Sequence, residues 1–205
     1  ISNDDLESFD PDPSSEHLEV AIEYLNEATA VQSGIFGETW SSMLHQSLQN
    51  NKVLLRFLKD DIRGFPRSDV GKQFEVVSKL IAGHQCRGKD RDVFYIEMGG
   101  FDHHSDMLNK LDDKLQDVES ALRAFVTEMK GLGEWENIAL IGVSEFSRTL
   151  TPNSGLGTDH AWAGNYFMMG GHVNGGRVLG TYPDDLTEKG QLTLGRGRLI
   201  PTTAW

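Results

Sequence analysis

Residues 137–143, NIALIGV, decide the expected fold class, because they are apolar throughout and show no alternation with polar residues. Strands that are covered on both faces have this pattern, and such strands are typical of parallel sheets. A second apolar run, residues 93–98 (VFYIEM), is rich in β-favouring side chains and ends at Gly99-Gly100. The two runs predict two strands of one parallel sheet.

A long amphipathic segment joins these runs. Its apolar residues recur at three- and four-residue spacing for about six turns. They are Met107, Leu108, Leu111, Leu115, Val118, Leu122, Phe125, Val126 and Met129. Gly131 and Gly133 end the pattern. Strand, helix and strand in this order predict a right-handed βαβ crossover, so the expected fold class is α/β.

The rest of the chain divides into a helical first half and a loop-rich end. Apolar spacing predicts helices over about residues 15–30, 38–61 and 71–82, after an acidic, proline-punctuated lead-in over residues 1–15. Beyond residue 143 we expect a short strand over residues 166–169. A glycine-rich hairpin is predicted over residues 170–183, with its turn at Asn174-Gly175.

The composition limits the classes of partner. The chain carries 31 acidic against 19 basic residues, a formal net charge of -12. A surface of this sign repels phosphate backbones and anionic lipids, so we expect no nucleic-acid or membrane partner and favour divalent cations. No apolar run approaches the roughly 20 residues that cross a bilayer. The single cysteine, Cys86, excludes an intramolecular disulfide and a cysteine-rich zinc site.

Ionisable side chains follow both predicted strands. Asp102 and His104 come after the first strand, and Glu145 comes after the second. Sites in open α/β sheets form beyond the carboxyl ends of the strands, and neighbouring strands lie about 4.8 Å apart. We therefore expect Asp102 and His104 within metal-bridging reach of Glu145. The pair Asp159-His160, on the long loop after the second strand, is expected to fold back over the same edge.

These residues predict a divalent metal site. Carboxylate with imidazole suits zinc, manganese or iron, and a carboxylate-dominated set suits magnesium or calcium. Arg148 would supply a forked contact to phosphate or sulfate. The alternatives are that Asp102 and Asp106 cap the long helix, and that Glu145 and Arg148 form an ion pair within a loop. No serine has the glycine-flanked elbow of a hydrolase, so no nucleophile is assigned.

Five stretches carry a family resemblance: FPRSDVGKQFEVVSKLI, GGFDHHSDM, ALRAFVTEMKGLGEWENIALIGVSEFSRT, GTDHAWAGNYFMMGGHVNGGRVLGTYP and GRGRLIPTTAW. From about residue 65 onward the chain resembles a mainly bacterial, sulfatase-like family, domain of unknown function 1501, of the alkaline phosphatase superfamily. The resemblance implies a parallel-sheet α/β/α sandwich of the alkaline phosphatase/sulfatase type. It divides the chain into an acidic and helical lead-in, residues 1–64, and the C-terminal part of a sulfatase-like domain, residues 65–205.

The resemblance also assigns roles to residues. It implies a divalent metal (zinc, manganese, calcium or magnesium) and Arg148 as the catalytic arginine. The implied metal ligands are Asp102, His104, Glu145, Asp159 and His160. The implied activity is metal-dependent hydrolysis of phosphate or sulfate esters by an exported protein. Its substrate would be an anionic small-molecule or polysaccharide ester.

The chain departs from the family pattern in two ways. Met107 stands where the family usually has a glutamine. The superfamily's first metal-binding aspartate and its nucleophile belong to an N-terminal half that this sequence lacks. We therefore expect an incomplete sheet that associates with the remainder of the protein or with another chain. The alternative function is a non-catalytic secreted binding or structural protein with the same fold. A third, an intracellular interaction module, rests only on the helical N-terminal third.

Overall fold

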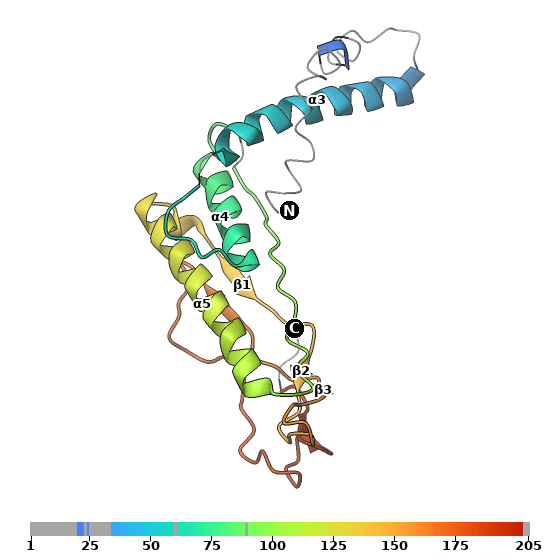
Figure 1. The fold of residues 1–205 in the computed structure, drawn as a ribbon, viewed down its shortest axis with the longest axis vertical. Helices are drawn as coiled ribbons and strands as arrows, with labels where there is room; N and C mark the ends of the chain where they lie inside the picture. The colour runs from blue at the N-terminus through green and yellow to red at the C-terminus, as the bar shows by residue number, and fades with distance from the viewer. Residues whose placement is uncertain (1–19, 23, 25–33, 60, 89, 203–205) are drawn as a thin grey trace. The chain divides into compact units, whose positions relative to one another are not determined.

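The computed structural model describes residues 20–22, 24, 34–59, 61–88 and 90–202. The chain divides into two compact units, residues 1–96 and 97–205, so each unit is described by itself (Figure 1). The predicted lead-in over residues 1–15 lies outside the described residues. Of the helix predicted over residues 15–30, only residues 20–22 and 24 are described, and these are helical. The predicted domain boundary after residue 64 falls within the first unit.

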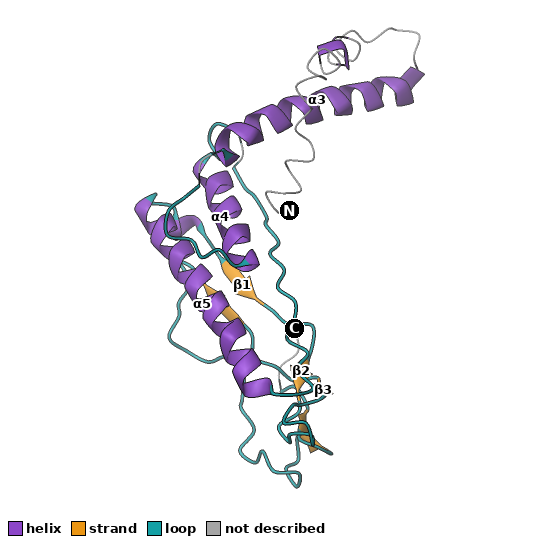
Figure 2. Cartoon of the chain, viewed as in Figure 1, coloured by secondary structure: helices purple, strands orange, loops and turns teal. Residues whose placement is uncertain are grey.

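Two helices in contact, α3 (Gly34–Leu58) and α4 (Asp69–Ala82), form the first unit (Figure 2). They confirm the two helices predicted over residues 38–61 and 71–82. The apolar spacing of α4 buries Val70, Phe74 and Val77 on one face. The two helices come close at Gly83, where an added Cβ would lie 2.8 Å from the ring of Phe57.

The second unit contains the long helix α5 (Met107–Gly131), as the amphipathic pattern predicts. Its buried residues, Ala121, Phe125 and Met129, share one face because they recur at four-residue spacing. A single 3-10 turn, η2 (Trp135–Asn137), follows and contacts α5. Its position directs the chain from the helix into the first strand.

The strands of the second unit pair as short antiparallel ribbons. They are β1 (Leu140–Gly142) with β4 (Phe167–Met169), β2 (Ser147–Arg148) with β3 (His160–Ala161), and β5 (Thr193–Leu194) with β6 (Arg198–Leu199). The strand predicted over residues 166–169 is confirmed as β4. The hairpin predicted over residues 170–183 is wrong, because these residues contain no strand.

The predicted parallel-sheet α/β/α sandwich is also wrong. Residues 93–98 belong to no strand in the described part of the chain, and Val93 and Tyr95 are 99% and 80% exposed. β1 instead pairs with β4, a strand that comes later in the sequence and runs antiparallel to it, so no βαβ crossover forms. The apolar run over residues 137–143 indicated an extended segment correctly. It did not indicate that Ile141 and Val143 would be exposed.

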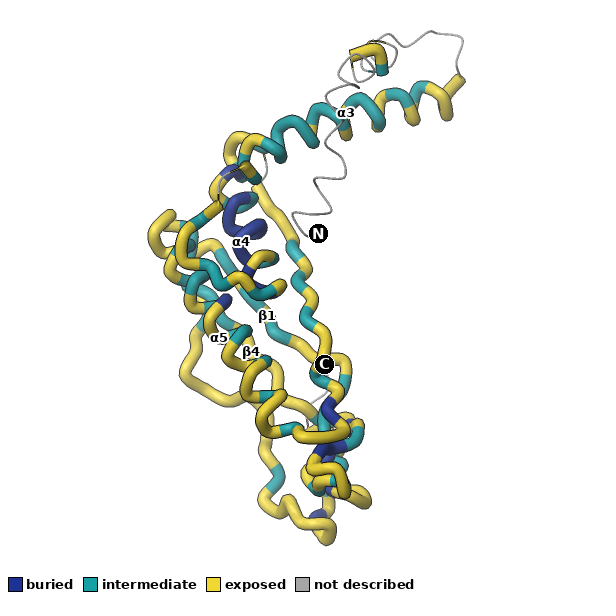
Figure 3. Tube along the Cα trace, viewed as in Figure 1, coloured by how far each residue is buried: buried dark blue, intermediate teal, exposed yellow. Residues whose placement is uncertain are grey.

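Packing within the second unit fixes where a site can form. Gly142 lies opposite Phe167, and an added Cβ there would lie 2.1 Å from the phenylalanine ring, so this approach requires glycine. Buried residues also gather around β2 and β3, where His103, Thr158 and Ala161 are buried (Figure 3). None of the described helices combines the length and apolar character that a membrane span needs. The ribbon of β2 and β3 therefore provides a packed base for the polar side chains around it.

Candidate metal centre

The pairing of β2 with β3 brings together two segments of the chain, residues 147–148 and 160–161. Arg148 lies opposite His160, and Ser147 lies opposite Ala161. The pairing continues one residue further, where the Thr149 N–H donates to the Asp159 carbonyl over 2.9 Å and the Asp159 N–H donates to Thr149 Oγ1 over 3.1 Å. Backbone pairing with residues 148 and 149 therefore fixes the positions of Asp159 and His160.

The loop over residues 153–158 joins this ribbon to the start of α5. The N–H groups of Asp106 and Met107 donate to the carbonyls of Gly155 and Leu156 over 3.2 and 3.1 Å. These are free donors of the first helical turn, and such donors need a partner outside the helix. The loop therefore satisfies two of the donors at the helix start, and the Asp106 side chain makes no capping hydrogen bond.

The same loop fixes the segment that carries Asp102 and His104. The Thr158 N–H donates to the His103 carbonyl over 3.1 Å, and Asn153 Nδ2 donates to the His104 carbonyl over 3.0 Å. Gly157 makes this approach sterically feasible, because an added Cβ would lie 2.1 Å from the carbonyl carbon of His104. Two segments about fifty residues apart in sequence, 102–104 and 158–160, thus lie side by side.

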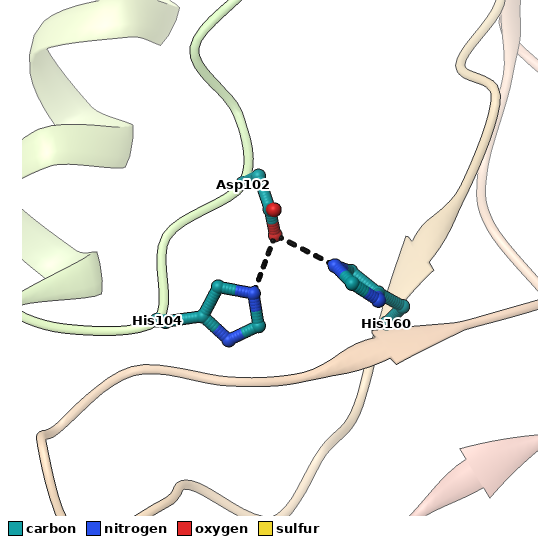
Figure 4. Close-up of side chains that lie close together, drawn as sticks. All are labelled: Asp102, His104 and His160. Carbon is teal, nitrogen blue, oxygen red and sulfur yellow. Dashed lines mark hydrogen bonds and ion pairs between the residues drawn. The ribbon is translucent and has the colours of Figure 1, made fainter.

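Three side chains converge at this junction: Asp102, His104 and His160 (Figure 4). Their donor atoms all lie within 4.8 Å of one another. Asp102 Oδ1 lies 3.1 Å from His104 Nε2 and 3.0 Å from His160 Nε2. The three side chains are between 48% and 59% exposed, so solvent reaches the cluster.

This arrangement fits a divalent cation. Metal–ligand bonds of about 2.1 Å place neighbouring ligands about 3.0 Å apart in octahedral and about 3.4 Å apart in tetrahedral geometry. The two separations in the cluster, 3.1 and 3.0 Å, are close to these values. Two imidazoles with one carboxylate are also a donor set that transition metals accept in proteins. Asp102, His104 and His160 would hold the ion.

Asp159 lies behind His104 rather than among the three donors. Its Oδ1 is 3.2 Å from His104 Nδ1, and its Oδ2 pairs with Arg196 Nη1. Desolvation raises the pKa of Asp159, but the Arg196 charge and hydrogen bonds from His104 and Asn153 outweigh it, so the pKa lies below the usual value. Histidine ligands commonly donate their second ring N–H to a carboxylate, which fixes the tautomer. The position of Asp159 matches that role.

Arg148 contacts the other end of the cluster. All three of its guanidinium nitrogens donate within the protein: Nε to Thr158 Oγ1 over 2.9 Å, Nη2 to the carbonyls of His103 and Thr158, and Nη1 to Asp102 Oδ1. Its side chain is only 19% exposed. Arg148 therefore fixes the Asp102 carboxylate and the backbone carbonyls of His103 and Thr158, rather than presenting an open fork to solvent.

The pKa of Asp102 is lowered from 3.8 to about 2, first by the Arg148 hydrogen bond and then by that of His160. A depressed carboxyl pKa stabilises the fold above the unfolded value and loses that effect as the pH falls through the folded value. We predict that metal-free protein loses stability between about pH 4 and pH 2, and that Arg148→Met raises the Asp102 pKa toward its usual range. Carboxyl NMR titration of both proteins measures this. An unchanged pKa in the variant would contradict the prediction.

The remaining predicted residues fall outside the cluster. Glu145 is exposed in the loop between β1 and β2 and does not join the three donors among the described residues. Met107 Sδ accepts a hydrogen bond from Thr158 Oγ1 over 3.3 Å, so the residue that replaces the expected glutamine still contacts the site loop. Sequence reasoning missed Arg196. Its available signals were its position between two glycines in a predicted loop and its place in GRGRLIPTTAW, one of the stretches that carry the family resemblance.

A comparison with protein families assigns most of the chain. Residues 60–191 match the family described as protein of unknown function (DUF1501). The chain belongs to this family. The match includes every residue of the three-donor cluster and ends five residues before Arg196. No curated protein and no solved structure shows a significant match to the chain.

Proposed function

We propose that this DUF1501 protein is a sulfatase-like, metal-dependent hydrolase of phosphate or sulfate esters. The observation that carries the proposal is the convergence of Asp102 Oδ1, His104 Nε2 and His160 Nε2 within 4.8 Å at a solvent-exposed position. Kinship with the alkaline phosphatase superfamily is part of the proposal and rests on the sequence motifs. Export of the protein and association with a further chain remain predictions from the same resemblance.

The donor set selects among metals. A mixed set of imidazole nitrogen and carboxylate oxygen suits zinc, manganese or iron, whereas calcium and magnesium prefer oxygen ligands throughout. Two of the three donors are imidazole nitrogens. Among zinc, manganese, calcium and magnesium, we therefore propose zinc or manganese as the resident ion.

The residues of the site have different roles in binding the ion. Asp102, His104 and His160 bind the ion, Asp159 orients His104, and Arg148 orients Asp102. A bound divalent ion supplies Lewis acidity and a bound water of lowered pKa. About half of each ligand side chain is exposed, which leaves room for an ester to approach. The net charge of -12 makes a compensating cation important for an anionic substrate.

One observation favours a non-catalytic binding protein as a second candidate. The nitrogens of Arg148, which the sequence assigned to the ester, all donate within the protein. An arginine with these contacts would fix the geometry of a metal centre but would not bind a substrate. The second candidate therefore keeps the metal site and lacks turnover.

The test uses the full chain after metal removal. Calorimetric titration with Zn²⁺, Mn²⁺, Mg²⁺ and Ca²⁺ should show one site, tightest for zinc or manganese. The loaded protein should hydrolyse p-nitrophenyl phosphate or p-nitrophenyl sulfate. His160→Ala should lose both properties, and His172→Ala, an exposed histidine outside the cluster, should keep both. Tight binding without turnover would favour the second candidate, and absence of metal binding would overturn the metal centre itself.

A further inference from the structure

The turn between β5 and β6 holds an arginine in a conformation that glycine adopts more readily. Arg196 has φ +68°, in the left-handed region, and lies between Gly195 and Gly197. Residues with a Cβ are disfavoured there, and such outliers cluster at functional sites. A glycine at this position would relieve the backbone strain. The presence of an arginine here therefore points to the contacts that its side chain makes.

Backbone hydrogen bonds bring this turn to the metal centre. The Leu150 N–H donates to the Gly197 carbonyl over 3.0 Å, and the Thr151 N–H donates to the Arg196 carbonyl over 3.4 Å. The approach is close, because an added Cβ on Gly197 would lie 2.8 Å from the Cβ of Leu150. The turn is therefore packed against the chain that leaves β2, and Arg196 extends from it to Asp159.

Arg196 ends a line of polar contacts that runs to the cluster. Its Nη1 pairs with Asp159 Oδ2, and Asp159 Oδ1 lies 3.2 Å from His104 Nδ1. On the other side of the same ring, His104 Nε2 faces Asp102 Oδ1 over 3.1 Å. Each carboxylate oxygen of Asp159 thus has its own partner, and the two contacts together fix the orientation of the carboxylate.

We infer that Arg196 is a positioning residue of the metal centre. It holds the Asp159 carboxylate so that Oδ1 accepts the Nδ1–H of His104, which leaves Nε2 as the metal-binding nitrogen. Partners of this outer kind fix the tautomer and ring orientation of histidine ligands. The inference rests on the proposed metal binding and adds a residue that lies beyond the matched family region.

An ordinary surface ion pair is the competing explanation for Arg196. Exposed pairs contribute little to stability and place no demand on the backbone. Arg196 differs, because its ion-pair partner within the described part of the chain is Asp159, whose side chain is 25% exposed and already directed at His104. Its backbone conformation also favours glycine over arginine. The two explanations predict different results for Arg196→Gly.

The experiment compares Arg196→Gly, Arg196→Lys and Arg198→Ala with the wild-type full chain. Arg196→Gly should weaken Zn²⁺ binding by about 10- to 100-fold, the usual range for an outer-shell partner, with a thermal midpoint equal to or above that of the wild type. Arg196→Lys should recover part of the affinity. Arg198→Ala is the matched control, since its guanidinium bonds to Gly195 O and lies outside the line of contacts. It should bind Zn²⁺ as the wild type does.

Two further readouts separate the explanations. In an Asp159→Asn background, Arg196→Gly should cause no additional loss of affinity, because Arg196 acts through Asp159. ¹⁵N NMR of metal-free protein should show the Nδ1–H form of the neutral His104 ring in the wild type and a mixture of tautomers in Arg196→Gly. Unchanged affinity in Arg196→Gly beside a metal-binding wild type would overturn this inference alone. A wild type that binds no metal would overturn the proposed function with it.

Discussion

Asp102→Asn should reduce metal affinity by more than 100-fold and leave the metal-free chain folded. Three groups converge on Asp102 Oδ1: His104 Nε2 at 3.1 Å, His160 Nε2 at 3.0 Å and Arg148 Nη1. The amide is isosteric and its oxygen still accepts hydrogen bonds, so these contacts can persist. It carries no charge, however, and is a poor ligand for zinc or manganese. Because losing an outer-shell partner already costs 10- to 100-fold, losing a direct ligand should cost more.

The matched control is Asp106→Asn, four residues further along the same segment. Asp106 accepts a hydrogen bond from Asn109 Nδ2 over 2.9 Å and is not among the three donors. Asparagine tolerates the left-handed backbone that residue 106 adopts, with φ +46°. Calorimetry with Zn²⁺ and circular dichroism on both variants measure affinity and fold. Equal affinities for the two variants would remove Asp102 from the metal centre.

Local patterns predicted the helices of this protein well and its sheet poorly. The spacing of apolar residues predicted α5 because a helix makes its backbone hydrogen bonds within its own segment. A strand needs a partner, and nothing in residues 93–98 or 137–143 identifies one. We paired these two runs because they flank a helix, whereas β1 pairs with β4 across a loop. Apolar composition indicated extended backbone without indicating the direction or identity of the neighbour.

The structure brings three of the predicted site residues together, although the parallel sheet that was expected to build the site does not form in the described part of the chain. Asp102 and His104 are separated by one residue, so they lie on one short segment whatever the surrounding fold. His160 joins them because β3 pairs with β2 and because the loop over residues 153–158 contacts the start of α5. Glu145 was predicted from strand adjacency alone, and it lies outside the cluster once that adjacency is absent.

Arg196 and Asp159 show the limit of reasoning from ligand types. A carboxylate beside a histidine in sequence suggests two ligands, but the backbone directs Asp159 to the far nitrogen of His104 instead. The partner of that carboxylate comes from a hairpin more than thirty residues away. Such a contact depends on tertiary hydrogen bonds between the turn and residues 150–151, which leave no periodic signal in the sequence.

Gly157→Ala should separate the two halves of the proposed metal centre and lower the stability of the protein. The added Cβ would lie 2.1 Å from the His104 carbonyl carbon and 2.4 Å from the Ser105 nitrogen, and both are backbone atoms that no side-chain rotation can move. The loop must therefore shift away from residues 102–105, which takes His160 away from Asp102 and His104. Overpacking of this kind costs about 1–3 kcal/mol. We expect a lower thermal midpoint together with weaker Zn²⁺ binding.

Gly164→Ala is the control for Gly157→Ala, because it adds the same methyl group to a neighbouring loop. Its Cβ would lie 3.5 Å from the Cβ of Ser147, an ordinary van der Waals distance. The control should keep the wild-type thermal midpoint and Zn²⁺ affinity, both measured on the full chain. If Gly157→Ala behaved like this control, the contact between residue 157 and the His104 backbone would not hold the site together. If it lost stability and kept full affinity, the three donors would not depend on this loop for their positions.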